Sequence, residues 1–181
     1  MEQKYKDSII FKLKSAKYHY ENIHNVLSDN FNYDDKLVAI SSEVTSFLLV
    51  YQSIFDILAQ YINLKRNLNL NPKRLYFHDI VKISNKIPDL REFVHKLDKA
   101  NEYINAYCNT VKHRNLIKVN TTQVHQTAMI GLGMHMGVHT YHSISSFKRN
   151  NRQFNMKPIP EYINETQDEL QSAVEELMSL I

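Results

Sequence analysis

One stretch of the chain, residues 103–120 (YINAYCNTVKHRNLIKVN), gathers most of the residue types that could act on a phosphate ester. Asn109 and His113 are four residues apart and so share one side of a helix, with Lys112 beside them. A histidine that titrates near neutral pH can move the proton of a ribose 2′-hydroxyl, and an arginine such as Arg114 can hold the phosphate. This set of residues favours RNA cleavage without a metal ion.

The position of Arg114 supports this interpretation. Phe93, Ala100 and Tyr107 recur every seven residues, and Arg114 is the next member of their row. An arginine at a core-facing position is costly to desolvate unless it has a partner or borders an opening. The alternative is structural: cations at the end of a helix offset its dipole, and Arg114 then bonds carbonyl groups or pairs with Asp56.

The segment NTVKHRNLI, preceded by YINAYC, resembles the N-T-x-K-H-R signature of a bacterial branch of the HEPN superfamily of helical bundles. The stretch SFLLVYQSIFDILAQYIN (46–63) is similar to an earlier helix of that family. The resemblance implies a homodimer in which arginine–polar–x–x–x–histidine motifs of two chains meet in a cleft. Members of the superfamily include metal-independent ribonucleases of toxin–antitoxin and other defence systems, and also inactive binding relatives.

Carried onto this sequence, the resemblance makes Arg114 the motif arginine and Asn115 the polar residue after it. Asn120 stands where the motif histidine is expected, so His113 is the nearest group for proton transfer. We therefore predict catalytic roles for Arg114, His113 and Asn115. Binding roles are predicted for Asn109, Lys112, Lys118, Asn120 and Asp56. Two functions remain open: a metal-independent endoribonuclease, or a non-catalytic binding module of the same fold.

Helices must position these residues. Apolar residues at helical spacing predict helices over residues 7–28, 35–66, 77–86 and 89–116, and a last one after Pro160. The second has the widest apolar stripe, with Leu37, Val44, Tyr51 and Leu58 in one heptad row and Ile40, Phe47, Ile54 and Tyr61 in the next. Asp56 is the only charge between residues 44 and 64, as in a membrane span. However, Gln52, Asp56, Gln60 and Asn63 align on one face, which predicts the core helix of a bundle.

The pattern changes before the last helix. Ile130, Leu132, Met134, Met136 and Val138 alternate with glycine and histidine, a period of two that predicts one strand. Asn150-Asn151 predicts a hairpin turn. The predicted fold is mainly α: a four- to five-helix bundle, residues 1–181 as a single domain, with a small antiparallel β element before the C-terminal helix. We place this β insert at about 124–157.

Other chemistry has weaker support. His135, His139 and His142 invite a metal site, but no cysteine or acidic residue lies near them, and we expect them on the solvent face of the strand. For this reason no metal is predicted. No glycine-rich phosphate loop is present, so no cofactor is predicted either. Cys108, the single cysteine, is expected to be a buried packing thiol.

The N-terminus, MEQKYKDSII, has no apolar segment behind its charges, and the formal net charge is only +3. Together with the lone cysteine, this composition predicts a cytoplasmic protein that does not engage a membrane. The partners we expect are RNA and a second copy of the chain, with a protein partner as the alternative for a non-catalytic module.

Overall fold

The computed structural model describes residues 2–28, 33–113, 117–130 and 133–180; at 33, 34, 113, 124–130 and 133–139 it describes the backbone alone. The α-helices are α1 (Glu2–Ser28), α2 (Tyr33–Lys65), α3 (Phe77–Ile83), α4 (Pro88–His113) and α5 (Ile159–Leu180), with short 3₁₀ turns at Pro72–Arg74 and Ser84–Lys86. The strands are β1 (Val119–Ile130), β2 (Gly133–Ile144), β3 (Phe147–Arg149), β4 (Arg152–Phe154) and β5 (Lys157–Pro158).

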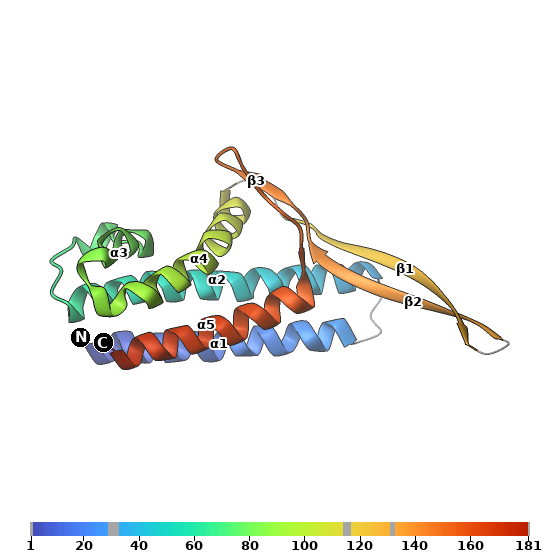
Figure 1. Cartoon of the computed structure of the whole chain (residues 1–181), viewed down its shortest axis with the longest axis horizontal. Helices are drawn as coiled ribbons and strands as arrows, with labels where there is room; N and C mark the ends of the chain where they lie inside the picture. The colour runs from blue at the N-terminus through green and yellow to red at the C-terminus, as the bar shows by residue number, and fades with distance from the viewer. Residues whose placement is uncertain (1, 29–32, 114–116, 131–132, 181) are drawn as a thin grey trace.

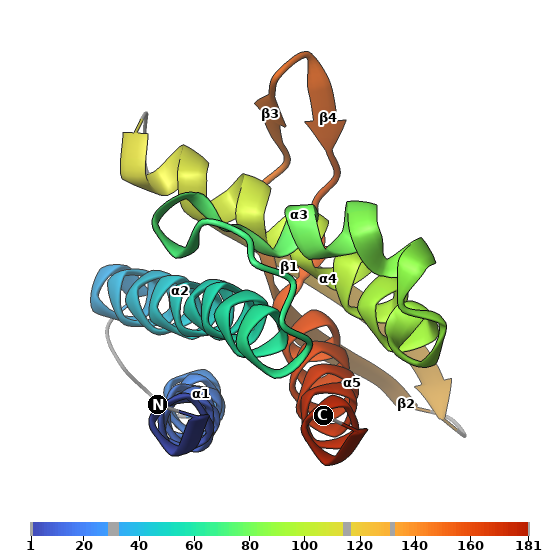
Figure 2. The ribbon, with the colours of Figure 1, turned by 90° about the vertical axis from the view of Figure 1, so that its left-hand side faces the viewer.

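Four of the helices form a closed ring around one core. Helix α1 packs on α2, α2 on α4, α4 on α5, and α5 returns to α1 (Figure 2). Helix α3 is an addition to this ring and packs on α2 and α4. The mainly α bundle and its antiparallel β element before the last helix are therefore confirmed.

Helix α2 supplies much of the core. Of its two predicted heptad rows, only Leu37 is partly exposed; the other members are buried. By length and composition α2 is also the one described helix that could span a membrane. Its apolar side chains face α1, α4 and the other elements that pack on it, so they form the seam of a helical bundle, as predicted.

Two polar side chains of α2 bind the loop that follows the helix. Asn63 binds the backbone of Leu70 twice, through its Nδ2 to the carbonyl and through its Oδ1 from the N–H, at 3.0 Å each. The Gln60 amide donates to the carbonyl of Pro72 at 2.7 Å. These bonds fasten the loop that carries the chain from α2 to α3, where Asn67 and Asn69 take positive φ angles.

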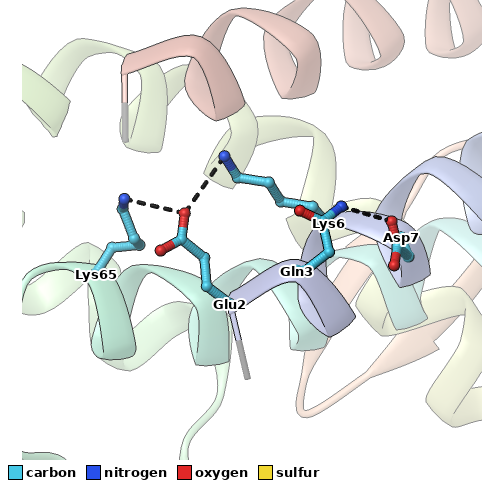
Figure 3. A network of polar contacts seen from close by, with 5 residues as sticks. All are labelled: Glu2, Gln3, Lys6, Asp7 and Lys65. Carbon is cyan, nitrogen blue, oxygen red and sulfur yellow. Dashed lines mark hydrogen bonds and ion pairs between the residues drawn. The ribbon is translucent and has the colours of Figure 1, made fainter.

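A partly exposed ion-pair cluster joins the start of α1 to the end of α2 (Figure 3). The Glu2 carboxylate lies 3.1 Å from Lys65 Nζ and 3.4 Å from Lys6 Nζ. The hydrogen bond from Lys65 holds the pKa of Glu2 below its ordinary value. Because its three side chains still reach solvent, the cluster orients the two helix ends and adds little to stability.

The β element differs from the prediction in one respect. The prediction of a single strand through residues 130–138 is wrong. Strand β1 ends at Ile130 and β2 begins at Gly133, and these two residues pair directly. The alternation of apolar residues runs across the connection between two antiparallel strands, which sequence period alone does not reveal. The insert also begins earlier than predicted, at Val119, where β-branched residues favour a strand.

Together β1 and β2 form a long ribbon that extends beyond the helices (Figure 1). From Val119 to Phe147 the sequence contains no Asp, Glu, Lys or Arg. The base of the ribbon is held by two residues of β5, which pair with Ser143 and Ile144.

A second, short hairpin is fastened to α4 by aromatic rings. Its turn is Asn150-Asn151, whose φ angles of 49° and 63° suit a two-residue hairpin turn, so this prediction is confirmed. Phe147 is stacked on Phe154 with ring centroids 5.0 Å apart, and its edge meets Tyr103 of α4 at 5.6 Å. The hairpin therefore stands on α4 and projects from the bundle (Figure 2).

Candidate nucleic-acid interface

Asparagines at four-residue spacing line one face of α4. They are Asn101, Asn105 and Asn109, which one helix turn brings into register. Asn109 Nδ2 donates to Asn105 Oδ1 at 2.5 Å and to the Asn105 carbonyl at 2.8 Å. Gln52 of α2 donates to the same Asn105 Oδ1 at 3.0 Å, and Lys112 Nζ donates to Gln52 Oε1 at 2.7 Å. A connected network of amides thus joins α2 to α4 and ends on a cation.

The network borders a cavity of about 300 Å³ between α2, α4 and the start of α3. It is lined by Gln52, Asp56, Tyr76, Phe77, His78, Asn101, Asn105 and Asn109. A neighbouring cavity of about 440 Å³ shares His78, Asn101 and Asn105 with the first and reaches the β3–β4 hairpin. We call the two together the amide groove.

Cations and aromatic rings border the amide groove. Lys99, Arg149 and Arg152 line its hairpin end, where Arg152 forms an ion pair with Glu102 and lies 5.4 Å from the Phe154 ring centroid. At the other end the exposed Tyr76 ring is stacked on His78, with centroids 5.9 Å apart and an interplanar angle of 19°. The groove therefore combines amide donors and acceptors, positive charge and a flat aromatic surface.

Asp56 brings a negative charge to the same groove. Partial desolvation of the carboxylate raises the pKa of Asp56 above its ordinary value, and the charge of Lys112 opposes that rise. Removal of Lys112 would therefore favour the protonated form of Asp56. A carboxyl group whose pKa is raised in a polar cavity can share a proton with a ligand at a milder pH than a free aspartate.

The structure brings together some of the predicted site residues. Asn109 and Asp56 line the groove, and exposed Lys112 joins it through Gln52. Lys118 lies elsewhere, in an apolar hollow between β1 and the first half of α2, and Asn120 pairs with Ser143 in the ribbon. Arg114 and Asn115 lie outside the described residues, and of His113 only its place at the end of α4 is described.

Comparison with known proteins found no relative of this chain. No protein-family model, curated protein or solved structure matches the chain.

The sequence interpretation did not name several groove residues as site residues, among them Gln52, Tyr76, His78, Asn101 and Asn105. The four-residue spacing of the asparagines was a usable signal, since it places amides on one helix face. Tyr76 and His78 gave no local signal. They reach the groove only because α3 packs on both α2 and α4.

Two other predictions concern residues outside the groove. Cys108 is fully buried, and burial raises the pKa of its thiol to about 12, which confirms a packing role. The solvent-face prediction is wrong for His142, which is buried. Its ring meets Thr121 of the paired strand, and α5 packs on β2 beside it. Within the described residues no cluster of His, Cys, Asp and Glu could hold a metal ion.

Proposed function

We propose that this protein binds single-stranded RNA in the amide groove. The observation that carries the proposal is the joint placement of an amide network, a stacked Tyr76–His78 pair and cations along two neighbouring cavities that share lining residues. Side-chain amides suit the hydrogen-bonding edges of unpaired bases, and aromatic faces stack on them. Lys112, Lys99 and the arginines of the hairpin supply charge for the phosphates. The resemblance of NTVKHRNLI to RNA-directed helical bundles points to the same ligand.

A single strand fits this groove better than a duplex. Duplex RNA is recognised mainly by shape and backbone contacts, which call for a broad cationic surface. Here the net charge is only +3 and the cations alternate with Asp98 and Glu102. Amide and ring contacts therefore carry more of the recognition than charge does.

Lys112→Met should weaken binding of a fluorescent single-stranded RNA by several-fold in fluorescence anisotropy. Loss of one phosphate contact should also reduce the slope of log affinity against log salt by about 0.7. The matched control is Lys14→Met, which makes the same charge change at an exposed position of α1. Equal losses in the two variants would mean that net charge alone drives binding, and would contradict a role for the groove.

A second candidate function is metal-independent cleavage of the bound RNA. The observation that favours it is His78, an imidazole in the same cavity as Asp56 and Asn109. An imidazole and a carboxyl group in one polar site can move the protons of 2′-hydroxyl attack and of the leaving 5′-oxygen. The resemblance adds Arg114 as the group that holds the phosphate.

Incubation with total RNA in EDTA tests cleavage. If the protein is a ribonuclease, wild type cleaves RNA without metal, and Arg114→Ala reduces the rate by about 10²-fold or more, as loss of a charge-stabilising donor does. His78→Asn separates the two proton-transfer candidates, since it spares His113. Light scattering on the same samples reports whether the chain forms the proposed homodimer. RNA that stays intact with folded protein would exclude the enzyme and leave the binding function.

A further inference from the structure

A cavity of about 480 Å³ lies away from the amide groove, where the base of the β1–β2 ribbon meets the end of α1 and the starts of α2 and α5. Among its lining residues are Lys36, Thr121, Gln123, Tyr141, His142 and Glu161. None of these residues belongs to the proposed RNA site, so a ligand of this cavity would be independent of RNA binding.

His142 is built into the wall of this cavity. Its side chain is only 8% exposed, and Thr121 lies directly opposite it in the paired strand. The ring Nδ1 and Thr121 Oγ1 are 2.9 Å apart. Among the described residues Thr121 is the only hydrogen-bonding partner of this ring, so Nε2 is left without one. Nε2 is not one of the described buried polar atoms without a partner, so it is open to the cavity, where a ligand or water can bond to it.

Lys36 brings a positive charge to the same place. Lys36 lines the cavity beside His142, and its ammonium donates to the carbonyl of Leu27 at 2.8 Å. Burial, and after it the charge of Lys36, lower the pKa of His142. An anion between the two would offset this lowering of the His142 pKa, because it pairs with the lysine and favours the imidazolium.

The other charged group in the lining is Glu161, which is exposed in the first turn of α5. Because Glu161 is exposed, water and salt screen its repulsion of an anion in the cavity. The start of this 22-residue helix itself favours an anion, since the helix dipole is positive there. The hydroxyls of Thr121 and Tyr141 and the amide of Gln123 add neutral hydrogen-bonding groups.

We propose that this cavity binds a small oxyanion of the phosphate class, as free phosphate or as a phosphomonoester. His142 Nε2 donates to one oxygen, and Lys36 supplies the countercharge. Thr121 positions the imidazole through Nδ1.

The test follows the histidine rings by NMR during titration with inorganic phosphate at constant ionic strength. His142→Gln assigns the resonance, and His24, bonded to Asn164 between α1 and α5, serves as the internal control. We expect a saturable shift of His142 alone, and about tenfold weaker binding in Lys36→Met, as for loss of a charge-assisted hydrogen bond. Lys65→Met, which removes a lysine of the Glu2 cluster, should bind phosphate as wild type does.

Two further arms complete the experiment. A nucleoside monophosphate that binds more tightly than phosphate identifies the ligand as a phosphomonoester, whereas equal affinities identify free phosphate. Sulfate keeps its charge across the pH range, so its affinity should rise as pH falls and His142 gains a proton. The proposal is overturned if His142 shows no saturable shift up to about 10 mM phosphate, or if Lys36→Met and Lys65→Met bind phosphate equally.

Discussion

Phe47→Ala is expected to lower the free energy of unfolding by about 3–5 kcal/mol. Phe47 is fully buried in α2, and its ring meets Tyr51 edge-on with centroids 5.0 Å apart. Tyr51 in turn donates from its hydroxyl to Gln167 of α5 at 3.1 Å. Loss of the ring therefore leaves a cavity beside the bond that joins α2 to α5. Urea denaturation followed by circular dichroism measures the effect.

The matched control is Phe11→Ala. Phe11 is also in a helix, but its side chain is 67% exposed, so its removal should change the free energy of unfolding by no more than about 0.5 kcal/mol. Similar losses at both positions would contradict the placement of the core on this face of α2.

Phe147→Ala should cost about 3 kcal/mol and should free the β3–β4 hairpin from α4. Phe147 is 9% exposed and contacts Phe154, Tyr103 and Tyr107. A hairpin this short is not stable by itself, so it depends on this aromatic contact. Hydrogen exchange of the amides at residues 147–154 should become faster than that of the helices.

This variant also links stability to function. The hairpin carries Arg149 and Arg152 to the end of the amide groove, so RNA affinity should fall even where the bundle stays folded. Met156→Ala, at a 57% exposed position just after the hairpin, should leave both exchange and affinity unchanged. Unchanged exchange in Phe147→Ala would show that the hairpin is held by other contacts.

The helices and the short turn could be predicted because their signals are local. The heptad rows of α2 describe a core seam, and the buried side chains of this helix follow them. Asn150-Asn151 tolerates the positive φ angles that a two-residue hairpin needs, whatever lies around it. In both cases neighbouring residues contain the full physical reason.

Features that depend on long-range packing could not be predicted in this way. Tyr76 and His78 become groove residues through the docking of α3, and His142 becomes buried through the pairing of β1 with β2. The ribbon has the sequence pattern of one strand because an apolar–polar alternation does not show where an antiparallel strand reverses. Asn105 is an intermediate case: its spacing was visible, but its role as acceptor for both Gln52 and Asn109 needed the structure.

Photo-cross-linking tests the RNA-binding proposal most directly, because it reports where the RNA lies. A single-stranded RNA with 4-thiouridine is irradiated on the protein, which is then digested with trypsin and analysed by mass spectrometry. We predict cross-links on the peptide Leu75–Lys82, which carries Tyr76 and His78, and their loss in Tyr76→Leu. Cross-links that leave this peptide unmodified and fall on α1 or the β1–β2 ribbon would contradict RNA binding in the amide groove.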